Sequence, residues 1–387
     1  MITVRDLTPD ELDVAVDVRT RSFGPLDAGD RPYWDAMMLR AIAERRVLAA
    51  YDGPELVAMA RALAFTQWFG GRGVPMAGIA GVVVAPHARS RGVATTVLRD
   101  LVQRCVELGD VVSGLYPATV VPYRRLGWED AGVRQRVSVD SHLLRSLATR
   151  GGPAVRVARP GDAEAVLALI DDVHARSRAN GPMSWDLAEL REELEDPDTF
   201  SYLADGGFVS YGWQGDDLVV QALFTTDPDV ARALWAVVGS GSSVARTVHA
   251  WVAPHDPVHQ LVAEQVARTA TVERWMLRVL DAPAAVAGRG FAPVVAGSAE
   301  LVVDDPYVPG AGGSWRLEVA GGAGALHPVE PADAALRLGP GGLACLYAGT
   351  QVRTLRAAGL AHGGTPAGDD LLDAALAGSP TYMLEHF

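Results

Sequence analysis

The stretch from Val82 to Thr95 combines residue types that could bind an anion. It reads Val-Val-Val-Ala-Pro-His-Ala-Arg-Ser-Arg-Gly-Val-Ala-Thr: an apolar β-branched run, a short basic turn and the start of a helical periodicity. The first N–H groups of a helix have no partner inside the helix, so a diphosphate suits this position. Gly92 would let the backbone approach closely, and Arg89 and Arg91 would add positive charge. A buried strand with a solvated turn is the alternative interpretation.

The segment Arg89 to Ala94 has the form Arg/Gln-x-x-Gly-x-Gly/Ala. This hexapeptide, placed after a β-branched strand, resembles the coenzyme A pyrophosphate loop of GNAT acetyltransferases. The resemblance implies that the preceding strand exposes backbone groups to the pantetheine arm and that acetyl-CoA is the co-substrate. The residues that it assigns to the cofactor are Val82, Val83, Val84, Arg89, Ser90, Arg91, Gly92, Val93, Ala94, Thr95, Ala118 and Thr119.

A second informative segment, Pro117 to Trp128, ends in the pattern Tyr-x-x-Leu/Phe-Gly-aromatic. In GNAT enzymes a tyrosine in such a pattern follows the fifth strand. A phenol near the cofactor sulfur can protonate the departing thiolate as a general acid, and Tyr123 is the candidate. The alternative is that Tyr123 only packs against Leu126 and Trp128.

Two residues depart from the family pattern. Pro122 stands directly before the tyrosine, where a branched aliphatic residue is expected, and it removes a backbone donor. Ala118 stands where a hydroxyl residue is often found. The departures predict a stiffer loop with one family contact fewer.

The composition restricts the class of protein and of partner. The chain has 387 residues, 49% hydrophobic and 21% charged, which is typical of a globular protein of two or three domains. The net charge of −13 argues against nucleic acid or an anionic membrane as a partner and favours a cationic ligand. Cys105 and Cys345 lie in apolar stretches, so we expect reduced core residues. The chain starts without a signal-peptide pattern and has no run of membrane-spanning length, so we expect a cytoplasmic protein.

The first unit, residues 1–148, is expected to surround this site. Its pattern predicts a short strand near the start, helices over 11–22 and 32–42, and a hairpin of 46–51 and 55–64 that turns at Asp52-Gly53-Pro54. Residues 65–74 contain three glycines and are predicted as an irregular connection, followed by a central strand over 76–84. A parallel strand over 111–116 is expected after the helix that begins at Val93.

The second unit, residues 149–285, follows a linker at Arg150-Gly151-Gly152-Pro153 and partly repeats the order of the first. We expect strands over 155–157, within 200–224 and over 244–252, and helices over 160–172, 185–196 and 231–238. The turn before the last helix has no Arg-x-x-Gly, and Asp227 and Asp229 would repel a diphosphate. This second GNAT-like unit is predicted to lack the cofactor loop.

The third unit, residues 286–387, alternates strands with glycine-rich turns before short helices. Strands are expected over 301–304, 314–319 and 334–338, and helices over 343–348, 353–358 and 369–377. This mixture resembles a sterol-carrier-like fold. The predicted fold class is therefore α/β (α+β): two tandem GNAT-like domains with mixed sheets, followed by a sterol-carrier-like C-terminal domain.

Two GNAT-like halves followed by a sterol-carrier-like domain resemble the enhanced intracellular survival (Eis) family of actinobacterial N-acetyltransferases. The resemblance covers the whole chain and rests on the cofactor-loop segment, the Tyr123 motif and Leu346-Tyr347-Ala348-Gly349. It implies a homohexamer, and it implies that the chain ends inside the active site.

The terminal aromatic residue of that family supplies its free carboxylate as the general base, which here would be Phe387. The preceding Tyr382-Met383-Leu384 is apolar for a chain end, which favours burial. Simple docking of the tail, with water or Glu385 as the base, is the alternative.

The resemblance implies direct attack of a primary amine on acetyl-CoA, with backbone N–H groups of Val82 to Val84 polarising the carbonyl and no metal. The nine histidines show no metal-ligand spacing. Carboxylates beside an aromatic wall suit a cationic acceptor, and the candidates are Asp27, Trp34 and Glu385, with Asp30 and Asp35 nearby. An exposed acidic helix face is the alternative.

Several functional readings remain open at this point. Aminoglycosides, polyamines and lysine side chains all fit the acceptor class. A non-catalytic protein that binds an apolar ligand in the third unit, or an assembly protein that uses the GNAT halves as scaffold, is the alternative function.

Overall fold

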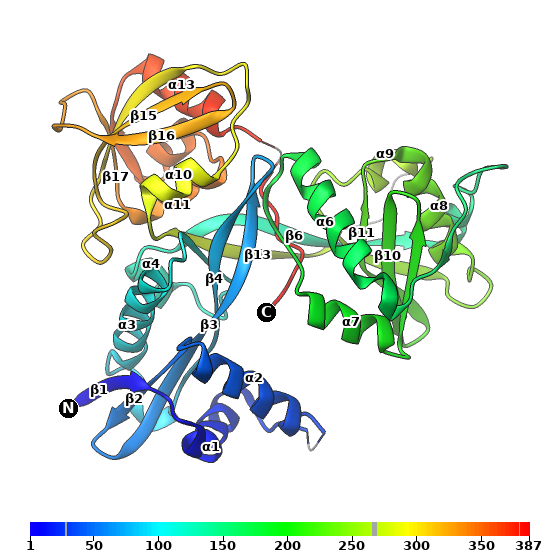
Figure 1. Cartoon of the computed structure of the whole chain (residues 1–387), viewed down its shortest axis with the longest axis horizontal. Coiled ribbons are helices and arrows are strands. Elements are labelled where there is room, and N and C mark those ends of the chain that lie inside the picture. The colour runs from blue at the N-terminus through cyan, green and yellow to red at the C-terminus, as the bar shows by residue number, and fades with distance from the viewer. Residues whose placement is uncertain (28, 265–268, 379) are drawn as a thin grey trace.

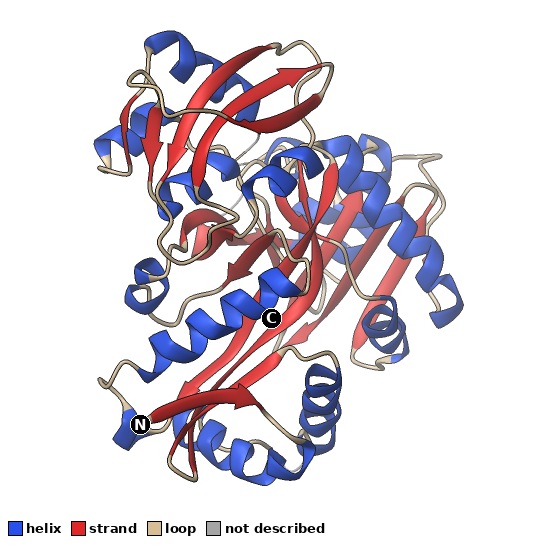
Figure 2. Cartoon of the chain, turned by 60° about the vertical axis from the view of Figure 1, so that its left-hand side comes forward, coloured by secondary structure: helices blue, strands red, loops and turns tan. Residues whose placement is uncertain are grey.

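A computed structural model describes residues 1–27, 29–264, 269–378 and 380–387. Two α/β halves share one 13-stranded sheet, and a third unit has a five-stranded sheet of its own. Figure 1 shows these parts as three lobes around the C-terminal tail, and Figure 2 shows the long sheet that joins the two halves. In the described residues, no helix is long and apolar enough to cross a membrane.

The first half contains the predicted strand, helix and hairpin order. Its elements are β1 (Ile2–Asp6), α1 (Leu12–Phe23), α2 (Arg31–Ala43), β2 (Val47–Asp52), β3 (Glu55–Phe69), β4 (Arg72–Val84), α3 (Val93–Glu107), β5 (Val112–Leu115), α4 (Val121–Arg125), β6 (Glu129–Asp140) and α5 (Ser141–Arg145). The strands β1 to β5 lie side by side in chain order, and only the β4–β5 pair is parallel.

The prediction of an irregular connection over residues 65–74 is wrong. β3 continues to Phe69 and β4 begins at Arg72, with a turn at Gly70 and Gly71, both at positive φ. Gln67 and Phe69 are fully buried, because they share the inward face of a strand with a period of two. The glycines indicate a hairpin turn here and not a loop, since positive φ costs glycine little.

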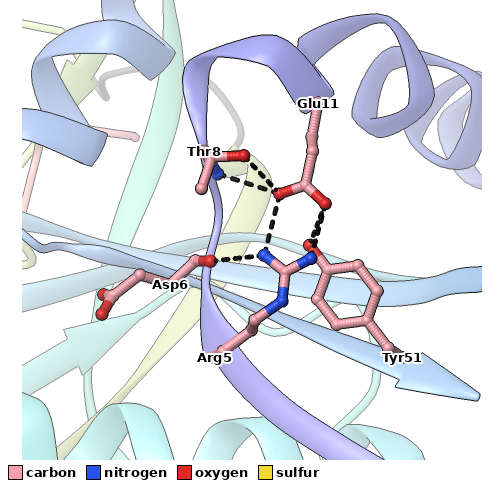
Figure 3. A network of polar contacts seen from close by, with 5 residues as sticks. All are labelled: Arg5, Asp6, Thr8, Glu11 and Tyr51. Carbon is pink, nitrogen blue, oxygen red and sulfur yellow. Dashed lines mark hydrogen bonds and ion pairs between the residues drawn. The ribbon is translucent and has the colours of Figure 1, made fainter. Parts of the chain in front are cut away.

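A cluster of polar side chains fastens the first strand to the helix that follows. The carboxylate of Glu11 accepts hydrogen bonds from Arg5 at 2.7 and 2.9 Å, from Thr8 and from the Tyr51 hydroxyl (Figure 3). The Arg5 guanidinium, followed by the Thr8 donors, lowers the pKa of Glu11 to about 2. The cluster fixes β1 beside β2 at the outer edge of the sheet.

The second half repeats this arrangement and exchanges a strand with the first. Its elements are β7 (Arg156–Val157), α6 (Ala163–Ser177), β8 (Asn180–Met183), α7 (Leu187–Glu195), β9 (Thr199–Ala204), β10 (Gly207–Gln214), β11 (Asp217–Thr225), α8 (Pro228–Gly239), β12 (Thr247–Val252), α9 (Val258–Leu261) and β13 (Thr269–Val279). β13 pairs with β5 of the first half, and β6 pairs with β12 of the second. Because β6 and β13 also pair with each other, one sheet runs through both halves. The boundaries at 148/149 and 285/286 stay predictions.

The third unit covers one end of the shared sheet. Its elements are α10 (Ala282–Gly288), β14 (Gly297–Val303), β15 (Gly313–Ala320), β16 (Ala323–Pro328), β17 (Leu336–Leu338), α11 (Pro340–Ala348), α12 (Val352–Ala357), β18 (Ala361–Gly363) and α13 (Pro366–Leu376). Arg278 of β13 and Asp305 after β14 form a fully buried ion pair at 2.9 Å that links the unit to the sheet. Cys105 and Cys345 are both free and buried, as predicted.

Candidate active site

The first half contains a notch in its sheet where two parallel strands separate. β4 pairs with β5 only from Met76 to Gly78, after which β5 ends and β4 continues to Val84. A register shift on the other edge of β4 leaves Gly81, at φ +59°, in a bulge opposite β3. The residues of β4 from 79 to 84 therefore present one edge without a partner strand in the part of the chain described, and that edge can bind an extended ligand.

The turn after β4 leaves the start of α3 open to an anion. Ser90 at φ +62° and Gly92 at φ +79° give the loop its shape, and no side chain caps the first N–H groups of α3. A Cβ added to Gly92 would meet no atom within 4 Å, so the positive φ and not packing accounts for the glycine. Arg89 donates to the Val84 carbonyl at 3.2 Å, whereas Arg91 forms an ion pair with Asp52 at 2.7 Å.

The notch beside β4 and the turn before α3 together border a cavity of about 950 Å³. The predicted residues that line it are Val82, Val83, Val84, Arg89, Ala94, Ala118, Thr119, Tyr123 and Phe387. Ser90, Arg91, Gly92, Val93 and Thr95 are not among its lining residues, and the Val93 side chain is buried in the core. The cavity thus brings both predicted catalytic groups to the predicted cofactor strand, while the roles of these residues stay predictions.

Tyr123 lies in α4, whose position explains the unusual Pro122. The proline occupies the first turn of the helix, where a backbone N–H has no intrahelical partner, so its missing donor costs nothing. The Tyr123 ring is buried, with its centroid 6.1 Å from that of Trp128 in an edge-on contact. Burial raises the pKa of Tyr123, so the phenol keeps its proton at neutral pH.

The C-terminal tail reaches the notch by passing between the two halves (Figure 1). Two glycines leave room for it: a Cβ on Gly132 would lie 2.2 Å from the Thr381 carbonyl, and one on Gly181 would lie 2.3 Å from the Tyr382 carbonyl. The Val133 amide donates to the Thr381 carbonyl at 3.1 Å. The tail is therefore held by backbone contacts in a slot that a side chain at either glycine would block.

Phe387 ends the tail inside the notch. Its ring centroid lies 4.9 Å from Phe65 and 6.3 Å from Tyr116. A Cβ on Gly78 of β4 would meet the Phe387 ring at 2.7 Å, so this glycine makes space for the terminal residue. Phe387 lines the large cavity and two others, so the last residue of the chain lies where three cavities adjoin.

The second of these cavities, about 520 Å³, is acidic and is formed by both halves. His386 and Phe387 both line it, and its walls also carry the aromatic rings of Phe65, Trp185 and Trp251. Its carboxylates belong to Asp186, Glu189, Glu193 and Glu385. Burial raises the pKa of Glu189, Glu193 and Glu385. Sequence reasoning missed the carboxylates of Glu189 and Glu193 on α7 and of Asp186 directly before it, since nothing local shows that this helix faces the other half.

The predicted acceptor residues are separated. Glu385 lines the acidic cavity, and its carboxylate accepts a hydrogen bond from Trp185 Nε1 at 3.3 Å. Trp34 lies in α2 and lines the third cavity, of about 230 Å³, together with Phe387. Asp27 is exposed and lines none of the three cavities.

The second half has the same strand arrangement without an open helix start. β11 and β12 pair only from Leu218 to Val220, and α8 follows β11 as α3 follows β4. Asp227, however, caps α8 by accepting hydrogen bonds from the amides of Asp229 and Val230. A carboxylate already occupies the anion position, so this half cannot hold a diphosphate there.

Comparison with known proteins identifies the family. Family models match residues 3–131 and 181–279 as acetyltransferase (GNAT) domains and residues 282–384 as a sterol carrier protein domain. The N-acetyltransferase Eis of Mycobacterium tuberculosis (strain CDC 1551 / Oshkosh) is 29% identical over 329 residues, 80% of each chain. A GCN5-related N-acetyltransferase from Kribbella flavida, known from a crystal structure, is 49% identical with a TM-score of 0.97, over 100% of this chain and 98% of that one. The chain belongs to the Eis family of GCN5-related N-acetyltransferases.

The fold of this Eis-family chain also matches that of Eis1 from Mycobacterium abscessus, with a TM-score of 0.78 at 22% identity over the full length of both chains. The predicted fold class, two GNAT-like halves and a sterol-carrier-like domain, is confirmed, and so is the prediction of an N-acetyltransferase. GNAT domains use acetyl-CoA, and the open start of α3 and the free edge of β4 suit its diphosphate and pantetheine arm. Among the described residues, no three His, Cys, Asp or Glu side chains gather as a metal site.

Proposed function

We propose that this enzyme transfers the acetyl group of acetyl-CoA to a primary amine of a cationic acceptor by direct attack. The observation that carries the proposal is the position of Phe387, which borders both the cavity beside the cofactor strand and the acidic cavity. A carboxylate at that junction can reach an amine from one side and a thioester from the other.

In this proposal the Phe387 carboxylate removes a proton from the attacking amine. Backbone N–H groups near Val82 to Val84 stabilise the negative charge on the thioester oxygen, and the C–S bond breaks as the amide forms. Tyr123 then donates its proton to the departing thiolate of coenzyme A. Burial raises the pKa of Tyr123, so the phenol carries its proton before transfer and gives it up only as the C–S bond breaks and negative charge develops on the sulfur.

The acidic cavity favours an acceptor with several positive charges. Four carboxylates and two tryptophans line a space of about 520 Å³, and the net charge of −13 attracts cations at longer range. A polyamine, an aminoglycoside or a lysine side chain would place one amine beside Phe387 and another ammonium against α7. Two further proposals are hexamer formation, which the family resemblance implies, and a cytoplasmic location, which the sequence pattern predicts.

The test is release of coenzyme A thiol from acetyl-CoA by the untagged chain with a panel of aminoglycosides, polyamines and lysine peptides. We expect turnover with at least one polycation, and much less with a monoamine that carries no second positive charge. A second chain with one glycine added after Phe387 moves the carboxylate and should lose turnover while acetyl-CoA still raises its melting temperature. Wild-type turnover in the extended chain would rule out the carboxylate base, and no turnover with any polycation would reject the acceptor class.

A further inference from the structure

Arg134 holds the last part of the C-terminal tail through a backbone carbonyl. It lies on β6, its side chain is about one-tenth exposed, and its Nη1 donates to the Leu384 carbonyl at 3.0 Å. Leu384 is three residues before the chain end. Beyond it, the aromatic contacts of His386 and Phe387 and the hydrogen bonds of the Glu385 carboxylate hold the tail.

The guanidinium is itself fixed on every side. Its Nε and Nη2 contact the Glu273 carboxylate of β13 at 2.7 and 2.6 Å. Its Cζ lies 4.0 Å from the ring centroid of Trp251 and 5.1 Å from that of Tyr116. Because Arg134 comes from the first half while Glu273 and Trp251 come from the second, this one side chain ties both halves to the tail.

Tyr116 provides a second anchor one residue earlier. Its hydroxyl donates to the Met383 carbonyl at 2.6 Å, and its ring packs against His386 at 4.6 Å and Phe387 at 6.3 Å. Burial raises the pKa of Tyr116, so the hydroxyl remains a donor. Two adjacent carbonyls of the tail are thus held by side chains that packing has already fixed.

The positive charge of Arg134 is compatible with a cationic acceptor. An unpaired guanidinium on the wall of the acidic cavity would repel an incoming ammonium, but Glu273 neutralises it at 2.6 Å. The pair can therefore hold the tail without lowering the attraction of the cavity for cations.

We propose that Arg134, with Tyr116, is a positioning residue for acetyl transfer: it fixes the tail so that the Phe387 carboxylate stays at the junction of the cavities. This inference rests on the proposed function of that carboxylate. Without the Leu384 anchor, the last three residues are held only by the aromatic contacts of His386 and Phe387 and the hydrogen bonds of Glu385, so the terminal residue can shift. A displacement of about 1 Å is enough to cost a reaction about 100-fold.

The test compares Arg134→Ala with Arg136→Ala in the untagged full-length chain. Arg136 lies two residues further along β6 and donates to Gln214, not to the tail, which makes it a matched control. Three quantities are measured for each: kcat, KM for acetyl-CoA, and the rate at which carboxypeptidase A releases Phe387, followed by mass spectrometry. The release rate reports the position of the tail and is not moved by a simple loss of stability while the chain remains folded.

For Arg134→Ala we expect kcat to fall by about 10- to 100-fold, the range for losing a charge-assisted hydrogen bond. The KM for acetyl-CoA should stay within about twofold, since the cofactor strand is untouched, and Phe387 should be released at least about tenfold faster. Arg136→Ala should match the wild type in all three. Tyr116→Phe, which removes only the hydroxyl, should lower kcat by about 3- to 10-fold and serves as the test if Arg134→Ala does not fold.

The outcomes separate the two proposals. If Phe387 is released faster from Arg134→Ala while kcat stays at the wild-type value, or if kcat falls while Phe387 stays protected, the positioning role is wrong. If the chain with a glycine after Phe387 turns over normally, the carboxylate base itself is wrong, whatever Arg134→Ala does.

Discussion

Gly78→Ala should reduce acetyl transfer by crowding the terminal residue. The added Cβ would lie 2.7 Å from a Phe387 ring carbon and 2.5 Å from a Phe65 ring carbon, whereas ordinary contact begins at 3.4 Å. The Phe387 ring must therefore retreat by about 0.7 Å, and its carboxylate moves with it. Gly78 has no positive φ, so alanine itself is compatible with the backbone.

We expect kcat to fall by about 10- to 100-fold, since a shift of about 1 Å in a reacting group costs about 100-fold. Overpacking should cost about 1 to 3 kcal/mol, which leaves a chain of this size folded. The assay is thiol release from acetyl-CoA with the best amine of the panel, together with thermal unfolding. Gly161→Ala is the control, because its Cβ would point into open space at an ordinary φ.

Phe387→Leu in the Gly78→Ala background tests the cause of the loss. The smaller side chain relieves the 2.7 Å contact with residue 387, but not the 2.5 Å contact with Phe65, and it keeps a terminal carboxylate, so kcat should recover in part. Two outcomes would refute the argument that the position of the Phe387 ring determines the position of its carboxylate. One is a wild-type kcat in Gly78→Ala; the other is a double variant that binds acetyl-CoA but does not recover kcat.

Three other predictions test the acid and the stability of the fold. Tyr123→Phe should lower kcat by about 100-fold or more with little change in the Kd of acetyl-CoA, and an equal loss of both would contradict a general-acid role. Arg278→Met should lower the free energy of unfolding, measured in urea, by about 3 to 5 kcal/mol, because it leaves Asp305 buried without its partner. Arg316→Met, which breaks an exposed ion pair, should lower it by less than about 1 kcal/mol. The fold lowers the pKa of Glu11 from 4.5 to about 2, so the ionised carboxylate stabilises the folded protein above pH 4.5. This stabilisation is lost as the pH falls towards 2. Glu11→Gln should therefore cost about 1 to 2 kcal/mol at pH 7, allowing for solvent screening, and flatten the acid limb of a stability-against-pH curve; an unchanged limb would contradict the assignment.

Local chemistry accounts for what the sequence determined by itself. A β-branched strand, a turn with Arg89 and Gly92 and a helix start are consecutive in the chain, and their anion-binding geometry needs no distant partner. The same holds for the Tyr123 motif and for the hairpin at Gly53. The absence of a cofactor loop near Asp227 was also readable from adjacent residues, and the structure adds that its carboxylate caps the helix.

The tertiary structure alone decided how distant segments meet. Periodicity shows which face of a strand is apolar but not which strand lies beside it, so the exchange of β6 and β13 between the halves had no local signal. For the same reason the carboxylates of α7 and the guanidinium of Arg134 could not be assigned to the site, since they lie about 200 and 250 residues before the tail along the chain. The slot at Gly132 and Gly181 exists only where both halves and the tail pack together, because backbone can pass that closely only where no side chain intervenes.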